Sequence, residues 1–267
     1  MSSTTPIAWH GLDLALTLDG ALLWPEERLL IAADLHLEKG SSFAGSAGRL
    51  LPPYDSAQTL ARLERLVEAH KPRRIVALGD SFHDRAGANR LDAEVAARIR
   101  RLTELTDWIW IQGNHDPRPP AHLGGRGVAE LALGPLTLRH DAVESVEVGG
   151  EVIGHYHPVA TIATRGRSFR RRCFVIGSRR LLLPAFGAYA GGLSVRAPAI
   201  RRLMEAVRWY RLAADAGDRK AQYNLGLCYR DGDGVDASLD EAARWWEAAA
   251  RQGHRSAKAR LREIAGG

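Results

Sequence analysis

Five short polar clusters in this 267-residue sequence contain the residue types that bind divalent metal ions. They combine carboxylate, imidazole and amide side chains, and they are Asp34-Leu35-His36, Gly79-Asp80, Gly113-Asn114-His115-Asp116, His140 and Gly154-His155-Tyr156-His157. Such oxygen and nitrogen ligands suit manganese, iron or zinc, and they differ from the thiolates of structural zinc sites. Each cluster alone fits an ordinary turn or a structural histidine, but five of them in one chain predict a metal centre.

Short apolar runs precede four of these clusters and are typical of buried strands. The runs span residues 28–33, 74–78, 108–111 and 136–139. Polar side chains at the ends of such strands are a usual place for chemistry in an α/β protein. Asp34 and His36 lie two residues apart, so their side chains point to the same face. His155 and His157 share a face in the same way if their segment is extended.

Segments of helical periodicity alternate with the first three of these strands. Residues 55–70 place Leu60, Leu63 and Leu66 on one helical face, and residues 91–105 form a second amphipathic pattern. This alternation of strand and helix predicts an α/β sheet with parallel strands.

The flanking segments predict further β structure. Asp19-Gly20, within the weakly alternating residues 7–24, indicates the turn of a β-hairpin. After residue 120 come short alternating runs that are punctuated by Gly134-Pro135 and Gly149-Gly150. These runs predict a second, largely antiparallel sheet.

The C-terminal part of the chain contains an internal repeat of period 36 and predicts a small all-α domain. Residues recur in the pairs Ala206/Ala242, Arg208/Arg244, Trp209/Trp245, Ala213/Ala249, Ala214/Ala250, Gly217/Gly253, Ala221/Ala257 and Leu225/Leu261. We expect the alanines to let two helices approach closely and the glycines to end the first helix of each unit. Trp209 and Trp245 are expected to fill the seam between helices.

The repeat resembles Sel-one-type repeats, relatives of the tetratricopeptide repeat, which usually bind other proteins. The change of pattern places a boundary near Ala197-Pro198, so we expect a first domain of residues 1–197 and a helical repeat domain of residues 199–267. Two units are few for a free-standing solenoid. We therefore expect the repeats to pack on the first domain or to dimerise.

Composition indicates a globular, basic chain. The formal net charge is +6 and the sequence pI is about 9.7, and nearly all of the positive charge is arginine, which binds phosphate bidentately. Arginines on solvated faces would give the same net charge without binding any partner. The charge alone therefore does not decide whether the chain binds nucleic acid. Cys173 and Cys228 suggest no disulfide framework and fit a reducing cytosol. With no signal peptide and no membrane span predicted, we expect a cytoplasmic protein.

Together, the five clusters resemble the signature of calcineurin-like metallophosphoesterases across residues 1–197. The resemblance implies an α/β/β/α sandwich of two mixed sheets flanked by helices. It also implies two divalent metal ions, with manganese expected first and iron or zinc as alternatives. One ion would be bound by Asp34, His36, Asp80 and His157, and the other by Asp80, Asn114, His140 and His155. Asp80 would bridge the two ions, which fits the need for an anion between neighbouring cations.

Three segments resemble, more narrowly, the ligase-associated DNA damage response endonucleases of the PdeM type. They are Asp34 to Gly40, Gly79 to Asp84 and Leu183 to Gly187. The resemblance implies a phosphodiesterase that cleaves DNA in DNA repair through a metal-activated hydroxide, with a DNA ligase and a helicase as associated proteins. The chain departs from those endonucleases near its end, because residues 194–198 run straight into the repeat where the family has one more strand.

His115 is not needed as a metal ligand in this scheme. We expect it to donate a proton to the leaving oxygen or to stabilise charge in the transition state. Asp116 is expected to orient His115, although it also fits an ordinary turn residue. We expect His83 and Asp84 either to line the opening of the same site or to have a structural role. Several arginines either steer a nucleic-acid backbone or form a solvated hairpin, and these are Arg165, Arg167, Arg170, Arg171 and Arg172.

Two other functions fit the same residues. A phosphomonoesterase or a nucleotide phosphodiesterase would use the same ligands, because substrate choice depends on the surrounding loops. A protein of another class, an interaction scaffold, would recruit partners through its repeats while its phosphoesterase part only binds. The intact ligand set favours an enzyme over a scaffold.

Overall fold

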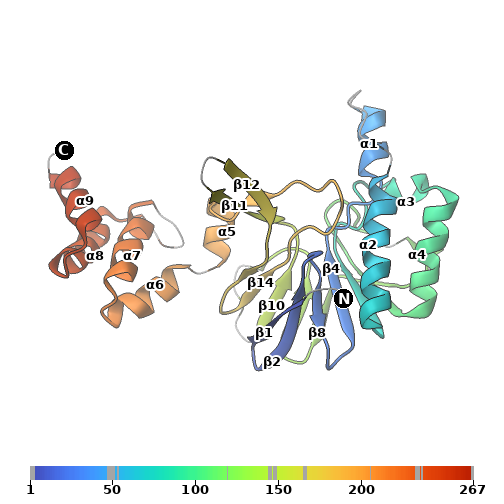
Figure 1. Ribbon diagram of the computed structural model, residues 1–267, viewed down its shortest axis with the longest axis horizontal. Coiled ribbons are helices and arrows are strands. Elements are labelled where there is room, and N and C mark those ends of the chain that lie inside the picture. The colour runs from blue at the N-terminus through green and yellow to red at the C-terminus, as the bar shows by residue number, and fades with distance from the viewer. Residues whose placement is uncertain are drawn as a thin grey trace. The chain divides into compact units, whose positions relative to one another are not determined.

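A computed structural model gives the fold of the chain. The structure describes residues 4–46, 52, 54–118, 120–143, 146, 149–164, 167–204, 206–231, 235 and 237–265. The chain divides into two compact units, Met1–Val195 and Arg196–Gly267 (Figure 1). Among the described residues, no helix is long and apolar enough to cross a lipid bilayer.

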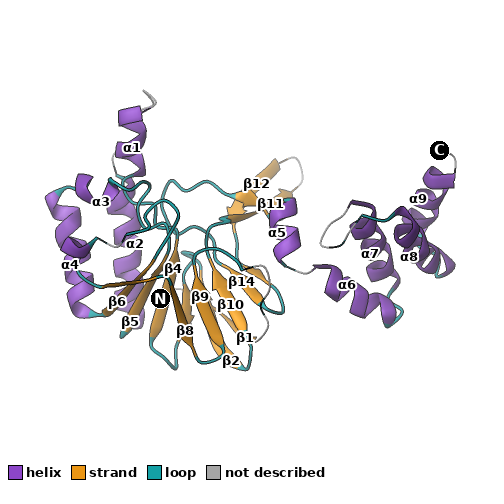
Figure 2. Ribbon diagram, turned by 180° about the vertical axis from the view of Figure 1, so that it is seen from behind, coloured by secondary structure: helices purple, strands orange, loops and turns teal. Residues whose placement is uncertain are grey.

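A seven-stranded sheet forms the centre of the first unit, and its strands lie in chain order (Figure 2). The strands are β1 (Thr4–Trp9), β2 (Leu12–Thr17), β3 (Leu22–Trp24), β4 (Leu29–Ala33), β5 (Arg74–Leu78), β6 (Asp107–Ile111) and β7 (Arg126–Val128). Pairing is antiparallel from β1 to β4 and parallel from β4 to β7. Asp19-Gly20 lies in the turn between β2 and β3. The predicted hairpin and the predicted parallel strands are both confirmed.

Helices α2 (Asp55–His70) and α4 (Ala93–Leu105) cover one face of this sheet, with Leu60 and Leu63 of α2 buried against it (Figure 1). The connections hold α1 (Lys39–Ser46), α3 (Gly87–Arg90) and the 3-10 helix η1 (Ala121–Leu123). Strand β4 is buried on both faces: Leu30 belongs to the core beneath the helices, and Ile31 belongs to the core against a second sheet. The first sheet is therefore the middle layer between the helices and the second sheet.

The second sheet has the strand order β13-β14-β10-β9-β8. Its strands are β8 (Glu130–Leu133), β9 (Leu136–Arg139), β10 (Gly150–Ile153), β13 (Val175–Ile176) and β14 (Arg180–Leu182). Strand β10 pairs in parallel with both β9 and β14, and only the outer pairs are antiparallel. The prediction of a largely antiparallel sheet is therefore wrong for its centre, because alternation indicates a strand but not the direction of its partner. Two mixed sheets with flanking helices confirm the predicted fold class.

A small third sheet ends the first unit. It contains β11 (Pro158–Thr164), β12 (Arg167–Arg172) and β15 (Leu193–Ser194) in the order β12-β11-β15. Strand β15 is only two residues long and pairs in parallel with Pro158 and Val159. The departure that the sequence shows near residue 194 thus corresponds to a very short last strand.

The second unit is all-helical. It contains α5 (Pro198–Leu203), α6 (Ala206–Asp215), α7 (Arg219–Asp231), α8 (Leu239–Arg251) and α9 (Arg255–Ala265). Small side chains such as Ala221, Ala249 and Ala257 are buried in its core. Gly217 and Gly253 follow α6 and α8 in the left-handed region, with φ of 91° and 83°, which confirms that these glycines end the first helix of each unit.

The tryptophan that fills the helical seam differs from the predicted one. Trp246 is fully buried, and its Nε1 donates to the carbonyl of Tyr223 at 3.1 Å, whereas Trp245 is half-buried. A Cβ on Gly226 would lie 2.4 Å from Trp246 Nε1, so this glycine provides the space for the indole. The periodicity identified Trp245 because it recurs with Trp209, whose side chain lies outside the described residues. Recurrence in sequence did not identify the buried position.

Candidate metal centre

The polar clusters meet at one end of the two larger sheets. Asp34 follows β4, Asp80 follows β5 and Asn114 lies beyond β6, while His140 follows β9 and His155 lies beyond β10. Carboxyl ends of parallel strands lie at the same edge of a sheet, and the parallel pairs β4–β5–β6 and β9–β10 therefore bring these residues together. All seven predicted metal ligands lie in this region.

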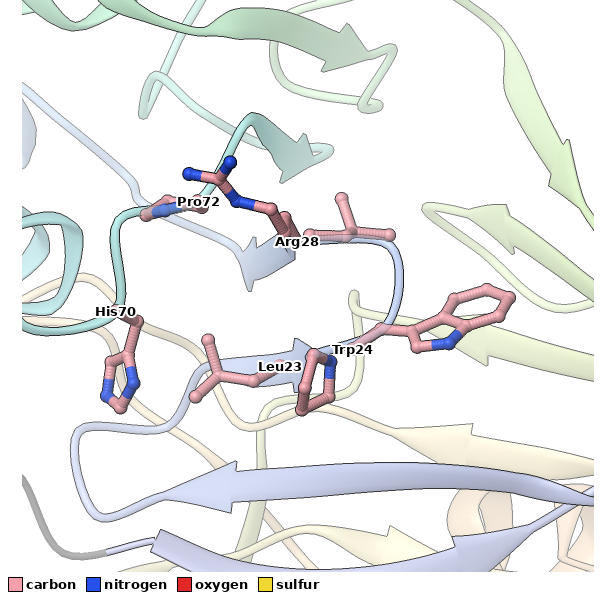
Figure 3. A pocket seen from close by; sticks show the side chains of 7 residues that line it. Leu23, Trp24, Arg28, His70 and Pro72 are labelled. Carbon is pink, nitrogen blue, oxygen red and sulfur yellow. The ribbon is translucent and has the colours of Figure 1, made fainter.

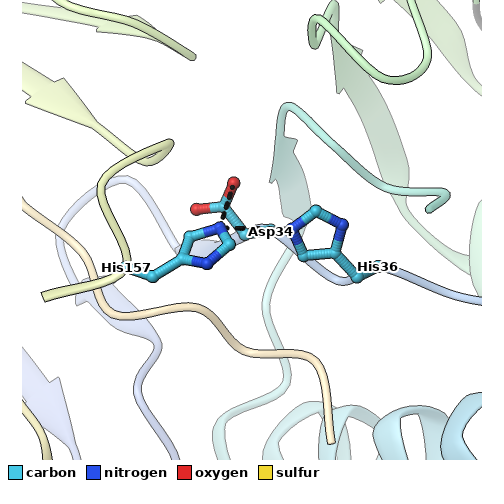
Figure 4. Close-up of side chains that lie close together, drawn as sticks. All are labelled: Asp34, His36 and His157. Atoms are coloured by element: carbon cyan, nitrogen blue, oxygen red, sulfur yellow. Dashed lines mark hydrogen bonds and ion pairs between the residues drawn. The ribbon is translucent and has the colours of Figure 1, made fainter. Parts of the chain in front are cut away.

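The first group consists of Asp34, His36 and His157, whose potential ligand atoms lie within 4.8 Å of one another (Figure 4). His157 Nε2 is 3.2 Å from Asp34 Oδ1, and the Nε2 atoms of the two histidines are also 3.2 Å apart. Asp34 is completely buried. Its carboxylate accepts the backbone N–H of His155 at 3.0 Å, which ties the first group to the segment that carries the second.

The second group consists of Asp80, His140 and His155, again within 4.8 Å of one another. Asn114 Oδ1 lies 2.8 Å from His140 Nε2 and 3.1 Å from His155 Nδ1, so it belongs to the same cluster of atoms. His140 also connects the groups, because its ring nitrogens lie 3.4 Å from Asp80 Oδ2 and 3.7 Å from Asp34 Oδ1. The two groups are neighbours that share one polar region.

The donor atoms of both groups fit divalent metal ions. In each group two imidazole nitrogens face each other at 3.2 Å beside a carboxylate, so three potential ligand atoms lie around one point. Imidazole, carboxylate and amide oxygen are the ligands of manganese, iron and zinc sites, so the chemistry of the set matches the predicted cofactors.

Five of the predicted ligands adopt left-handed backbone conformations, which are rare for residues other than glycine. Their φ angles are 53° for Asp34, 43° for His36, 42° for Asp80, 63° for His155 and 43° for His157. Such conformations cost of order 1–3 kcal/mol each and concentrate at functional sites. The surrounding fold therefore holds the backbone in unfavourable geometry where these side chains converge.

Glycines before the ligands make room for side chains from neighbouring strands. A Cβ on Gly79 would lie 2.2 Å from His140 Nδ1, and a Cβ on Gly113 would lie 2.2 Å from Asp80 Oδ1. Heavy atoms do not approach so closely, so a larger residue would displace these side chains. Gly79 and Gly113 are thus required because each leaves room for the side chain of a predicted ligand from a neighbouring segment.

The protonation of the groups follows from burial and from mutual charge. Burial raises the pKa of Asp80, but hydrogen bonds from His140 and from the backbone of His115 outweigh it and lower the pKa to about 2. Burial and the nearby His157 lower the pKa of His36 to about 2. Burial also lowers the pKa of His140, but the Asp80 and Asp34 carboxylates outweigh it and the net shift is upward. The carboxylates of Asp80 and Asp34 thus favour the protonated, positively charged form of His140.

His115 lies at the edge of the second group, and its side chain is 41% exposed. Its Nδ1 donates to the carbonyl of His83 at 2.7 Å, and its Nε2 lies 3.8 Å from Asp80 Oδ2. The His115 backbone N–H donates to Asp80 Oδ1 at 2.9 Å. The imidazole is therefore fixed at one nitrogen, while the other faces the metal centre.

Asp116 does not contact the His115 ring among the described interactions. Its Oδ2 accepts the backbone N–H of Phe82 at 3.0 Å, which fastens the loop after β5. Burial, with a contribution from Asp80, raises the pKa of Asp116 to about 7. The direct orienting contact that the sequence assigned to Asp116 is supplied instead by the carbonyl of His83, because the loop conformation turns the carboxylate toward Phe82.

A row of rings beside the first group was not identified from the sequence as a unit. His83 stacks on His115 with centroids 5.6 Å apart and on Phe43 with centroids 5.5 Å apart. The Lys39 ammonium lies 5.9 Å from the Phe43 ring centroid, one helical turn earlier on α1. Asp84 forms a 2.6 Å ion pair with Arg90, which supports a structural role for Asp84 rather than a role in lining the site. Lys39 and Phe43 are spaced i, i+4 on a helix, and this spacing is the feature of the sequence from which their contact could have been predicted.

The arginines of β12 are mostly used by the fold. Arg172 Nη2 donates to the carbonyls of Gly187 at 2.6 Å and Ala188 at 3.0 Å. Arg170 Nη2 donates to the carbonyl of Gly192 at 2.9 Å, and the Arg171 guanidinium lies 5.4 Å from the centroid of the Phe169 ring. Arg165 lies outside the described residues. Steering of a nucleic acid by this segment stays a prediction.

The fold and the paired groups define a metal-dependent phosphoester hydrolase. The family model of calcineurin-like phosphoesterases matches residues 27–162, and the chain belongs to this family. Sel1 repeats match residues 200–218 and 219–254. These findings confirm the resemblances to calcineurin-like metallophosphoesterases and to Sel-one-type repeats.

Three solved structures are similar to parts of the chain. The nuclease MPE of Pseudomonas putida is 35% identical over 72% of this chain and 91% of its own, with a TM-score of 0.59. A Sel1 repeat protein from Oxalobacter formigenes is 34% identical over 24% of this chain and 32% of its own, with a TM-score of 0.21. Yfce, a phosphoesterase from E. coli, is 18% identical over 62% and 83%, with a TM-score of 0.36. No curated protein matches the chain significantly.

Proposed function

We propose that residues 1–197 form a phosphodiesterase that cleaves DNA with two divalent metal ions, manganese first. The observation that carries the proposal is the convergence of two groups, Asp34/His36/His157 and Asp80/His140/His155, each with its ligand atoms within 4.8 Å. The similarity to a nuclease at 35% identity over 72% of the chain supports a nucleic-acid substrate. A cytoplasmic role in DNA repair extends the same proposal.

The ligands divide between the two ions around a shared carboxylate. Asp34, His36, Asp80 and His157 would hold one ion, and Asp80, Asn114, His140 and His155 would hold the other. When bound, the ions activate a water molecule for attack on phosphorus and polarise the phosphoryl oxygen. Asp80 is ionised because its pKa is held near 2, so it can serve as the anion between two cations.

His115 would supply the proton that the leaving oxygen needs. A carbonyl only accepts hydrogen bonds, so the contact with His83 requires a hydrogen on His115 Nδ1. In a doubly protonated ring, Nε2 would present a second N–H toward the metal centre. A histidine that is positioned in this way contributes typically 10²- to 10⁴-fold to a proton transfer.

The proposal is tested with three substrates and one control. Manganese-dependent hydrolysis is measured for a simple phosphodiester, a phosphomonoester and DNA, with Asp80→Asn as the inactive control. We expect hydrolysis of the diester and of DNA by the wild-type protein, and loss of both in the variant because the shared ligand would no longer carry a negative charge. Hydrolysis of the monoester alone would instead indicate a phosphomonoesterase. Bound metal without any turnover would favour the scaffold.

The second unit suggests an additional function, which is protein binding. Its Sel1 repeats form helix pairs with a small-residue core, an architecture that stacks helices into extended surfaces. We propose that residues 199–267 recruit a protein partner to the hydrolase, with repair proteins such as a ligase or a helicase as candidates. Co-purification of such a partner with the full chain, and its loss when the repeats are removed, is the corresponding test.

A further inference from the structure

We propose that a pocket beside His115 binds a phosphate group that neighbours the phosphate being hydrolysed, so that the preferred substrate is a polynucleotide. The inference rests on the proposed function, because it assigns a substrate subsite to the same centre. The pocket has a volume of about 460 Å³ and is lined by Arg85, Asp116, Pro117 and Arg118. These residues lie outside the predicted set of metal ligands.

Two loops form the walls of this pocket, and each contributes one arginine. Arg85 belongs to the loop after β5, and Arg118 belongs to the loop after β6. The loops are joined by the contact of His115 Nδ1 with the His83 carbonyl at 2.7 Å and by the hydrogen bond from Phe82 N to Asp116 Oδ2 at 3.0 Å. The contacts that position His115 therefore also link the two loops that line the pocket.

The backbone around Arg85 is further fixed by its neighbours. Asp84 on one side forms an ion pair of 2.6 Å with Arg90 of α3, and its Oδ1 accepts the backbone N–H of Ala86 at 2.9 Å. The Arg85 side chain extends from a braced turn. The side chain of Arg85, and not its backbone, would therefore have to become ordered when a ligand binds.

The charge of the pocket is unbalanced and faces outward. Arg85 and Arg118 are exposed, and neither guanidinium has a hydrogen-bond or ion-pair partner among the described residues. Other arginines of this unit, such as Arg74 and Arg98, form ion pairs of 2.6 Å. Two free guanidinium groups across one pocket match a phosphate, which accepts bidentate hydrogen bonds from arginine.

The carboxylate in the pocket wall does not offset this preference. Asp116 Oδ2 is occupied by the backbone N–H of Phe82, and Asp116 Oδ1 is buried. Both oxygens are therefore turned into the protein rather than toward a ligand. The groups that remain available in the pocket are the two cationic side chains.

The position of the pocket determines which phosphate it would bind. Asp116 is two residues beyond the proposed ligand Asn114 and directly follows His115, so the residues that line the pocket directly follow the proposed catalytic residue along the chain. A phosphate in the pocket would belong to the nucleotide next to the scissile bond. A phosphomonoester or a simple diester carries no such group, and the pocket therefore selects for a polynucleotide.

Dinucleotides that differ by one terminal phosphate test this subsite. Manganese-dependent cleavage is compared for a dinucleotide without terminal phosphates and for its 5′- and 3′-phosphorylated forms. We expect one of the phosphorylated forms to be cleaved with a kcat/KM about tenfold higher, because charge-assisted hydrogen bonds contribute this much. The advantage should disappear in Arg85→Ala/Arg118→Ala, while cleavage of the unphosphorylated dinucleotide stays unchanged. No advantage of either form, or an advantage that persists in the variant, would overturn the subsite.

Arg101→Ala serves as the matched control. Arg101 is also exposed and has no partner among the described residues, but it lies in the last turns of α4, which lead to the start of β6 and so to the opposite end of the sheet. This variant should retain the full advantage of the phosphorylated form.

Binding separates failure of the subsite from failure of the proposed function. A labelled oligonucleotide is titrated with each protein at several salt concentrations, and fluorescence anisotropy gives the Kd. Loss of Arg85 and Arg118 should weaken binding and reduce the salt slope by about one per arginine. If the wild-type protein cleaves no substrate, the proposed function fails, and this titration still decides the subsite. Equal slopes for the wild type and the double variant would refute it.

Discussion

One hydrogen bond determines how His115 can act. The His83 carbonyl accepts from His115 Nδ1 at 2.7 Å, and the His83 ring stacks on the same imidazole. The ring is therefore held from two sides while Nε2 faces Asp80. A side chain that is fixed but coordinates no ion in the proposed scheme is suited to act on the substrate rather than to build the centre.

Substitution of His115 should separate turnover from metal binding. We expect His115→Ala to keep both ions but to lower kcat on DNA by about 10²- to 10⁴-fold, because the leaving oxygen loses its proton donor. A nitrophenyl diester should be much less affected, since nitrophenolate leaves without protonation. Metal content is measured by elemental analysis, and kcat is measured for both substrates. Metal loss in this variant, or unchanged cleavage of DNA, would contradict the assignment.

At the scale of elements, the turns after the strands hold the site together. Gly79 has a φ of 70° and leaves room for His140 from the other sheet. Asp80 and His155 directly follow Gly79 and Gly154, and both ligands adopt left-handed conformations. The strand ends thus determine which side chains face each other, and the glycines permit the two sheets to approach.

Gly79→Ala should damage the centre through space as well as through backbone conformation. We expect a loss of metal affinity and a destabilisation of about 1–3 kcal/mol, because the new Cβ would meet His140 Nδ1 at 2.2 Å. Gly11→Ala is the matched control, since Gly11 has a φ of 76° but no atom within 4 Å of an added Cβ. Calorimetry gives the metal affinity and chemical denaturation gives the stability. Equal effects of the two substitutions on metal affinity would show that the contact with His140 is unimportant.

At the scale of the whole molecule, two units with separate cores share one chain. The cores of the first unit lie on either side of the seven-stranded sheet, and the core of the second unit surrounds Trp246. The proposed ligands all lie in the first unit, while the Sel1 matches lie in the second. This division supports separate roles in hydrolysis and in recruitment.

Trp246→Ala tests that division of roles. The indole is fully buried, and replacing a buried tryptophan by alanine costs about 3–5 kcal/mol. We expect the helical unit to unfold at lower denaturant concentration while metal affinity and hydrolysis of a simple diester stay at wild-type values. Circular dichroism follows the helices, and the diester assay follows the first unit. A parallel loss of hydrolysis would show that the hydrolase depends on the repeats.

The sequence alone determined the features that depend on neighbours along the chain. Apolar runs located β4, β5 and β6, and the polar residues after them identified the candidate ligands, because strand ends and motif spacing are local properties. The period of 36 residues located the repeats for the same reason. Resemblance to a known family then supplied how Asp80 and the other ligands would be shared.

Only the tertiary structure decided the contacts between distant residues. Three features depend on such contacts: the parallel pairing of β10, the burial of Trp246 instead of Trp245, and the hydrogen bond from His115 to the His83 carbonyl. Their partners lie between 14 and 32 residues away along the chain, and in the case of Trp246 on another helix. The pocket between Arg85 and Arg118 likewise exists because two loops are held together. Spacing along a chain does not encode such partners, since they follow from how the layers pack.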